Sequence, residues 1–323
     1  MPSYRAFGLR IDADCELPAL RPAATERPAD LIIALTAGDW PGRAADERDC
    51  RPPAPPTVDE PAGFRVSRAS GGPFRFAYPD GVEFLVSPDG RHVRGRWPAG
   101  MTLADAAEYL LGPVFALVLR LRGVVCLHAS VIAAGDGCFA VLAPAGHGKS
   151  TSAAAAARRG WPIVTEDLLA LAMVAETVHA VPSYPRVRLW PDAAAGIFGS
   201  ADTLPRLTPA NPAWDKRYVD LDGDGYRFAG EPLPLHAIYT HLRRPHEAPM
   251  FEPLPPAQAL VVLLANVYTR WQPDRRQRTH EFDLLRRLAG EVPVKRFRGP
   301  YGLEHVDANV AALRDDCLRH GAR

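Results

Sequence analysis

The chain has 323 residues, of which 47% are apolar, and this is enough for a sizeable core in one large domain or two ordinary ones. Its 38 basic and 37 acidic residues leave a formal charge of +1, so no excess positive charge is present to bind nucleic acid or an anionic membrane. The composition therefore favours a small or peptidic partner. It leaves a homo-oligomer open.

Cysteine usage and apolar runs indicate the compartment. The five cysteines are scattered and lack C-x-x-C spacing, so we expect neither a disulfide framework nor a zinc site. The amino terminus lacks the order of a signal peptide. The apolar run 110–121 is broken by Pro113 and ends in Arg120, which is too short to span a membrane. We therefore predict a soluble, cytoplasmic protein that binds no membrane.

Short alternating apolar runs, separated by Pro, Gly and Asp turns, dominate the first hundred residues. They lie at 4–11, 31–35, 64–66, 74–78, 82–86 and 92–97. The proline-rich stretch 51–56 cannot join a sheet, because proline lacks the backbone donor, and we predict an extended loop there. The pattern predicts a β-rich amino-terminal domain over residues 1–100.

A helical period begins at residue 102 and ends before Gly123, and it marks the start of a second domain over residues 101–323. Two strands, 124–132 and 138–142, follow on either side of a turn that contains Asp136-Gly137. Asp-Gly between apolar runs is typical of a hairpin, so we expect these strands to be antiparallel neighbours.

The segment 143–151, Ala-Pro-Ala-Gly-His-Gly-Lys-Ser-Thr, is typical of a P-loop. Glycines allow successive backbone N–H groups to point at phosphate oxygens, and the helix that follows presents its positive end. Lys149 would reach the β and γ phosphates, and the Ser150 hydroxyl would complete a magnesium shell. The segment predicts ATP and Mg²⁺ as cofactors. The predicted nucleotide-binding residues are Ala145, Gly146, His147, Gly148, Lys149, Ser150 and Thr151.

An acidic pair, Glu166-Asp167, lies in a predicted strand at 162–172, beyond a short alanine-rich helix that ends at Gly160. Asp167 follows Lys149 by eighteen residues, enough for one helix and one returning strand, so the pair should lie beside the phosphates. A carboxylate there can bind magnesium or accept the proton of an attacking hydroxyl. We predict Ser150, Glu166 and Asp167 as metal ligands, and the sequence does not divide the roles between the two acids.

His128 lies in the strand before the P-loop. Depending on where the hairpin turns, it falls opposite Ala145 or Ala143, and in either case it borders the loop. A histidine there can hydrogen-bond a catalytic carboxylate or the incoming phosphoryl group, although a histidine in an apolar strand is more often a packed core residue. The predicted catalytic residues are Asp167, His128 and Lys149.

Arg186 and Arg188 alternate on one side of a predicted edge strand, where a guanidinium can clamp a phosphate or a substrate carboxylate, or can simply be solvated. The pair Lys216-Arg217 is interpreted as exposed charge without specific chemistry. Three further helices are predicted at 256–269, 278–290 and 303–320.

Residues 123–171 resemble the catalytic domain of the HPr kinase/phosphorylase family, and more closely its divergent relatives such as lasso-peptide precursor kinases. The resemblance is carried by Leu127-His128-Ala129-Ser130, the hairpin into the P-loop and the acidic pair. It implies an α/β fold related to phosphoenolpyruvate carboxykinase, a mixed sheet with helices that carries a P-loop. It also implies that Asp167 is the general base for a serine hydroxyl, with His128 beside it.

Three features differ from the family pattern. Ala143 replaces the first P-loop glycine, Glu166 replaces an aspartate, and the glycine-rich signature segment of HPr kinases is missing. That segment is tied to HPr handling and to the reverse reaction, so HPr itself and a phosphorylase activity are not expected.

The sequence therefore predicts an ATP-dependent serine kinase acting on a peptide or protein, with the carboxy-terminal serine of a lasso-type precursor as one acceptor. Two alternatives stay open. One is a small-molecule kinase or carboxykinase-like phosphotransferase on the same scaffold. The other is a nucleotide-switched module in which the β-rich domain binds a peptide.

Overall fold

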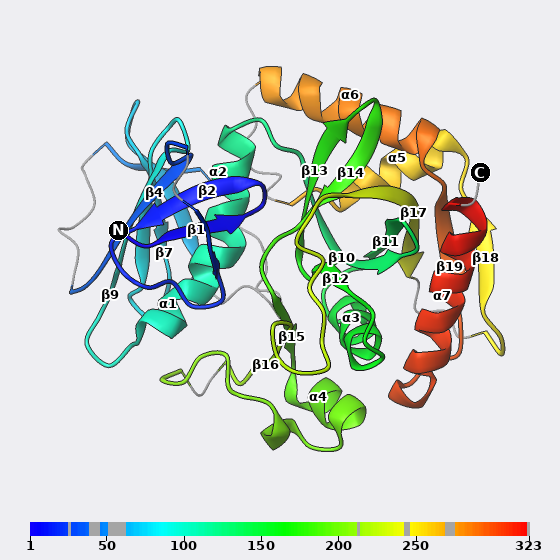
Figure 1. The fold of residues 1–323 in the computed structure, drawn as a ribbon. Helices are drawn as coiled ribbons and strands as arrows, with labels where there is room; N and C mark the ends of the chain where they lie inside the picture. Colours follow the sequence, from blue (N-terminus) through cyan, green and yellow to red (C-terminus); the bar gives the residue numbers. More distant parts are fainter. Residues whose placement is uncertain are drawn as a thin grey trace. The chain divides into compact units, whose positions relative to one another are not determined.

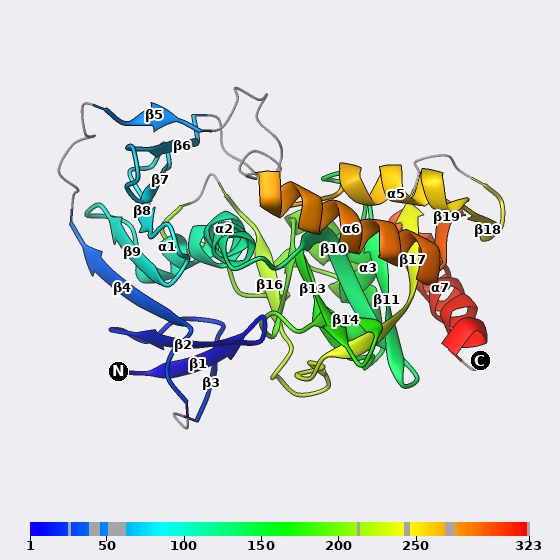
Figure 2. The ribbon, with the colours of Figure 1, turned by 90° about the horizontal axis from the view of Figure 1, so that it is seen from above.

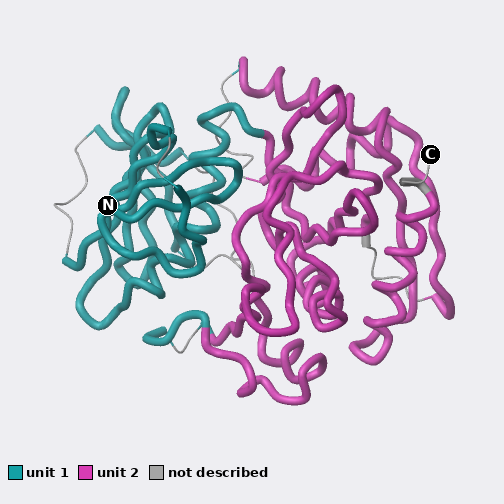
Figure 3. The backbone as a smooth tube through the Cα atoms, in the orientation of Figure 1, with its two compact units in different colours: residues 1–124, 207–214, 269–275 teal, residues 125–206, 215–268, 276–323 magenta. Residues whose placement is uncertain are grey.

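The computed structural model describes residues 1–24, 27–38, 46–50, 63–211, 214–241, 246–268 and 275–321, as a mixed α/β fold (Figures 1 and 2). The chain divides into two compact units (Figure 3). Unit 1 is Met1–Val124 with two short later segments, and unit 2 holds most of the remainder. This division puts residues 101–124 in unit 1, although the sequence assigned them to the second domain. The predicted loop at 51–56 lies outside the described residues.

Within the described residues, unit 1 holds a nine-stranded mixed sheet in the order β3-β1-β2-β4-β9-β8-β7-β6-β5. Its strands are β1 (Ser3–Ala6), β2 (Leu9–Ala13), β3 (Arg21–Pro22), β4 (Leu31–Ala37), β5 (Arg48–Asp49), β6 (Arg65–Arg68), β7 (Phe74–Ala77), β8 (Glu83–Val86) and β9 (His92–Trp97). The predicted run 4–11 is two strands rather than one. Phe7 and Gly8 both have positive φ, 52° and 74°, and they turn the chain back between β1 and β2.

The predicted helix at 102–121 is confirmed, with a change of pitch in its middle. It consists of α1 (Leu103–Tyr109), a π-helical turn (Leu110–Val114) that contains Pro113, and α2 (Phe115–Leu121). Gly123 ends it at φ 79°, donating to Arg120 O while the next N–H donates to Leu119 O. This is the Schellman arrangement that a glycine after the last turn makes available.

Unit 2 is built around an eight-stranded mixed sheet, within the part of the chain that the structure describes. The strands are β10 (Cys126–Ala134), β11 (Gly137–Leu142), β12 (Ile163–Thr165), β13 (Leu168–Val174), β14 (Thr177–Val181), β17 (Leu233–His241), β18 (Met250–Pro253) and β19 (Val294–Arg298). The main path runs β11-β10-β13-β14-β17-β19-β18, β12 also pairs with β10, and β11 pairs in parallel with β17. A separate two-stranded sheet is formed by β15 (Arg186–Leu189) and β16 (Arg217–Asp220).

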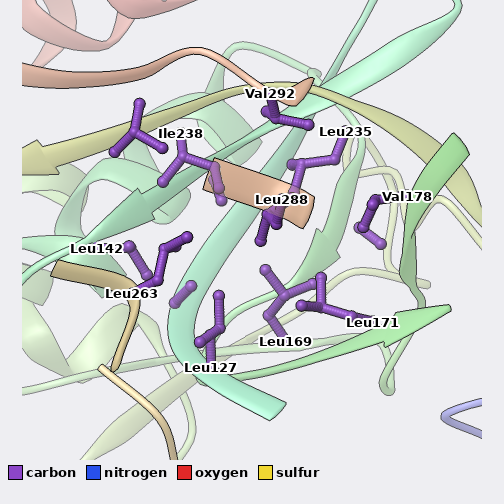
Figure 4. Packing of buried hydrophobic residues seen from close by; sticks show 14 of the residues in the cluster. Leu127, Leu142, Leu169, Leu171, Val178, Leu235, Ile238, Leu263, Leu288 and Val292 are labelled. Atoms are coloured by element: carbon purple, nitrogen blue, oxygen red, sulfur yellow. The ribbon is translucent and has the colours of Figure 1, made fainter. Parts of the chain in front are cut away.

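Helices cover both faces of the unit 2 sheet, because alternate strand residues are apolar on each side. One core contains Leu127, Leu142, Leu263 and Leu288 and is covered by α5 (Pro256–Ala265) and α6 (Arg275–Glu291) (Figure 4). The other core packs against α3 (Lys149–Arg158), α4 (Pro191–Phe198) and α7 (Val306–Gly321). Two 3-10 turns, Ala201–Thr203 and Leu303–His305, complete the regular structure of the described residues.

The helices after residue 250 were predicted with shifted ends. α5 ends at Ala265 rather than 269, because the chain then runs beside β10, and the predicted helix at 303–320 begins with a 3-10 turn. The structure begins α6 three residues earlier than predicted. None of the helices in the described ranges combines the length and apolar character that a membrane span requires.

Candidate active site

The loop between β11 and α3 has the backbone that a P-loop needs. Gly146 and Gly148 have φ values of 74° and 88°, a region that residues with a side chain rarely adopt. No atom lies within 4 Å of where a Cβ would stand at either position, so the loop borders open space. Gly148 is also the N-cap of α3, and the first N–H groups of a helix have no intrahelical acceptor. All seven predicted nucleotide-binding residues lie in this loop and first turn.

The side chains of the loop are tied to the loop itself. Lys149 is 6% exposed, and its Nζ donates to Ala143 O at 2.7 Å and to Pro144 O at 3.3 Å. The His147 ring places Nδ1 2.9 Å from Ala145 O. Phosphate oxygens can replace carbonyl oxygens as acceptors of a lysine ammonium, so these contacts are compatible with a phosphate contact. The phosphate contact of Lys149 itself stays a prediction.

The hairpin before the loop fixes the position of His128. Ala134 pairs with Gly137 and Ala129 with Leu142, so Gly135-Asp136 form the turn. The paired residues end there, and the same register continued by one residue aligns His128 with Ala143. This is the second of the two predicted alignments, and the first is wrong.

The predicted strand 162–172 is interrupted at the acidic pair, which is a correction to the sequence prediction. β12 ends at Thr165 and β13 begins at Leu168, although both pair with β10. In a regular strand two successive side chains point to opposite faces of the sheet. The bend at Glu166 and Asp167 instead lets both carboxylates reach the same arginine.

Arg188, on β15, joins the two acids. Its Nε lies 3.0 Å from Glu166 Oε2 and its Nη2 lies 2.9 Å from Asp167 Oδ2. The Ser150 hydroxyl donates to the other oxygen of Glu166, Oε1. Glu166 therefore connects the first turn of the P-loop helix to Arg188. Arg188 in turn connects Glu166 to Asp167.

Asp167 also pairs with His128, whose Nε2 lies 2.9 Å from Oδ1. The side chains of His128 and Asp167 are 27% and 19% exposed. Burial acts to raise the pKa of Asp167, but the charges of Arg188, His128 and Lys216 and the hydrogen bond from His128 outweigh it and hold that pKa well below its usual range. Asp167 is therefore ionised at neutral pH.

The structure shows contacts of three basic residues that the sequence did not predict. Arg186 lies with its guanidinium 4.0 Å above the Tyr218 ring, whereas Arg188 binds the acidic pair. Lys216, interpreted from the sequence as exposed charge, lies 5.0 Å above the Trp190 ring and contributes to the electrostatics of Asp167. Its contribution depends on the pairing of β15 with β16, for which the local sequence around Lys216 gives no signal.

Tyr268 is a further residue that the sequence did not indicate. Its hydroxyl donates to Asp167 Oδ2 at 3.4 Å, and its ring lies edge-on to that of His128 at 5.5 Å between centroids. It follows the end of α5 by three residues, and only the tertiary fold brings it to the site.

The residues present fit a magnesium–nucleotide complex. The Ser150 hydroxyl and the Glu166 carboxylate are oxygen ligands of the kind that magnesium takes. Among the described residues, no group of three or more His, Cys, Asp or Glu side chains could hold a metal by itself. An ion would therefore complete its shell with phosphate oxygens and water, as magnesium commonly does at nucleotide sites.

Comparison with known proteins gives little further information. No family model matches the chain, and neither does a curated protein. Among solved structures, the chain is similar to the HPr(Ser) kinase/phosphatase from Coxiella burnetii, with 11% sequence identity and a TM-score of 0.31. The match covers 59% of this chain and 97% of that chain. A likeness this weak carries no argument about function.

Proposed function

We propose that this chain is an ATP-dependent kinase that transfers the γ-phosphoryl group to a serine hydroxyl of a peptide or protein. One observation carries the proposal. Ser150, Glu166, Arg188, Asp167 and His128 form a continuous chain of polar contacts from the first turn of the P-loop helix to a candidate base. A phosphate bound at the loop and a hydroxyl bound at Asp167 would therefore be neighbours.

The loop residues bind and orient the nucleotide. With nucleotide bound, backbone N–H groups of the segment from Ala145 to Thr151 would donate to phosphate oxygens, and Lys149 would exchange its two carbonyl partners for the β and γ phosphates. Ser150 and Glu166 would hold a magnesium ion. Magnesium, when bound, compensates phosphate charge and orients the γ-phosphoryl group.

Asp167 binds the acceptor hydroxyl and takes its proton. In the transfer, the serine oxygen forms a bond to the γ-phosphorus, the bond from that phosphorus to the β–γ bridging oxygen breaks, and ADP leaves. A carboxylate with a lowered pKa is a weak base, but phosphoryl transfer proceeds through a loose transition state in which the proton can move late. His128 donates Nε2–H to Oδ1 and keeps the carboxylate in its orientation.

The test is intact mass spectrometry of acceptors incubated with Mg-ATP and either the wild-type chain or Asp167→Asn. The acceptors are a peptide that ends in serine, as a lasso-type precursor would, the same peptide with an internal serine, free serine and an HPr protein. We expect an addition of about 80 Da, the mass of one phosphoryl group (HPO3), on a peptide and none on free serine or the HPr protein. We expect the rate of phosphoryl transfer by Asp167→Asn to be at least about 100-fold lower than that of the wild type.

Nucleotide affinity, measured by calorimetry, should stay within about twofold in Asp167→Asn, because the loop itself is unchanged. Asp222→Asn, in an exposed turn, is the matched control and should transfer normally. ATP binding without any transfer to a peptide would contradict the kinase proposal. Loss of both binding and transfer in Asp167→Asn would contradict the assigned role of Asp167.

A further inference from the structure

A three-residue segment after α5 completes the edge of the strand that carries His128. β11 pairs with β10 as far as Ala129 and then leaves the sheet as the P-loop begins. Along that same edge, His128 N–H donates to Asn266 O at 2.8 Å and Tyr268 N–H donates to Cys126 O at 2.9 Å. Between them, Val267 forms a bridge with Leu127. We call residues 266–268 the strap.

The strap packs against the core through Val267, and Tyr268 lies on the opposite face. Val267 is 5% exposed and belongs to the same core as Leu127, so the bridge is packed on the apolar face of β10. Because successive side chains alternate, Tyr268 lies on the opposite face, diagonal to His128 across the two segments. The backbone therefore fixes where the tyrosine ring stands.

Tyr268 contacts both members of the His128–Asp167 pair. Its ring lies edge-on to the imidazole at 70° between planes, and its hydroxyl is 3.4 Å from Asp167 Oδ2, the oxygen that also binds Arg188. This contact is long for a hydrogen bond between oxygens, and bonds at catalytic groups often tighten only when substrate is bound.

We propose that Tyr268 is a positioning residue for the His128–Asp167 pair. Its ring sets the plane of the imidazole, so that Nε2–H points at Oδ1, and its hydroxyl supports Oδ2 while the acceptor hydroxyl binds. This inference rests on the proposed function, since positioning a base matters only if Asp167 is one. The alternative is that Tyr268 only packs the end of α5 onto the sheet.

Two variants separate the ring from the hydroxyl. Tyr268→Phe keeps the ring contact and removes one hydrogen bond, and we expect kcat to fall about fivefold. Tyr268→Leu removes both the ring contact and the hydrogen bond, and we expect kcat to fall about 50-fold. This lies in the range seen when a residue that orients a metal ligand is lost. The KM for ATP and the thermal midpoint of Tyr268→Phe should equal those of the wild type. Tyr301→Phe, 60% exposed, is the matched control and should behave as the wild type.

A second readout does not depend on catalysis. In the nucleotide-free protein, the His128 Nε2–H held on Asp167 should give a proton resonance protected from exchange with water. We expect it to shift in Tyr268→Phe, to vanish in Tyr268→Leu and to be unchanged in Tyr301→Phe. If the wild type transfers no phosphate, the proposed function fails, and this resonance still decides the role of Tyr268.

Retention of the unshifted resonance in both Tyr268 variants would overturn the inference. So would an unchanged kcat in Tyr268→Phe together with a loss in Tyr268→Leu that matches its unfolded fraction, because that is the behaviour of a packing residue. Should Tyr268→Leu fail to fold, Tyr268→Phe decides: a kcat and a resonance equal to those of the wild type would reject positioning.

Discussion

Asp167 and Asp316 are two carboxylates of unit 2 that share their kinds of partner and differ in their surroundings. Each accepts a bond from a tyrosine hydroxyl and from a cationic side chain. Asp316, on α7, binds Lys295 Nζ on β19 at 2.7 Å and the Tyr239 hydroxyl on β17 at 2.7 Å. Both Lys295 and Asp316 have side chains only 7% exposed. The Asp167 side chain, at 19%, is reached by solvent beside the P-loop.

The difference lies in which elements the two carboxylates connect. Asp316 fastens a helix to two central strands, and its partners are held in regular structure on every side. Asp167 lies at a break between two strands, and its partners come from a strand, a two-stranded sheet and the strap. Removing one partner of a buried ion pair is costly, because the other charge stays buried without a partner. A pair at the edge of a phosphate loop can instead exchange partners during a reaction.

Breaking the buried ion pair between Lys295 and Asp316 should have the greatest consequence. Asp316→Asn leaves Lys295 buried without a carboxylate, and we expect the free energy of unfolding to fall by about 3 kcal/mol in urea titrations. Asp167→Asn should cost less than Asp316→Asn, because Arg188 keeps Glu166 as a partner and the Asp167 side chain, at 19% exposure, is partly screened by solvent. Equal losses in the two variants would show that the Asp167 cluster is structural in the same sense.

The same pair predicts a pH dependence. Burial acts to raise the pKa of Asp316, but its bonds with Lys295 and Tyr239 outweigh this and lower it. A lowered native pKa gives stability that is present above the unfolded value, about 3.9, and is lost as the pH falls through the native value. The difference in the free energy of unfolding between the wild type and Asp316→Asn should therefore have its full size at pH 7 and be smaller at pH 3. A gap of the same size at both pH values would contradict this reasoning.

Local signals explain what could be predicted of the site. The glycines of the P-loop, the hairpin turn at Gly135-Asp136 and Gly160 after α3 each act within a few residues of their own position. Gly160 has φ 73° and donates to Ala157 O, as a helix-ending glycine should. Hairpin pairing then placed His128 beside the loop, because the register of two adjacent strands follows from the length of their turn.

Long-range pairing explains what could not be predicted. The strap lies about 140 residues beyond the strand that it completes, and its pairing depends on the tertiary packing of α5 rather than on any nearby residue. The interruption of the strand at Glu166 was missed for a related reason. The two acids at the bend both pair with Arg188, which is a residue of another sheet, so no residue near Glu166 indicates the interruption.

A change at Arg188, a partner of Asp167, should have an effect of intermediate size. The guanidinium of Arg188 reaches one acid through Nε and the other through Nη2, a fork that a lysine ammonium cannot reproduce. We expect Arg188→Lys to lower kcat about tenfold with little change in the urea midpoint, in contrast to the partners of Asp316. Arg287→Lys, on the exposed side of α6, is the control. A large loss of stability with unchanged kcat in the folded protein would assign Arg188 to structure.

The smallest expected effect concerns Lys216, which acts on Asp167 through its field. Loss of the Lys216 charge should raise the pKa of Asp167 and make this carboxylate a slightly stronger base, although it stays ionised at neutral pH. For a partly solvated charge of this kind the interaction is worth about 0.5–1 kcal/mol, so Lys216→Met should raise kcat/KM for the acceptor by about two- to fivefold at most. Lys216→Arg keeps the charge and should keep the activity of the wild type. Because salt screens such an interaction, the effect of Lys216→Met should be largest in 0.05 M salt and smaller in 0.5 M salt, where the Debye length is only about 4 Å. A change that does not depend on salt and is equal in both variants would mean that Lys216 acts by packing on Trp190. In that case the Asp167 site would resemble the Asp316 site more closely than its exposure suggests.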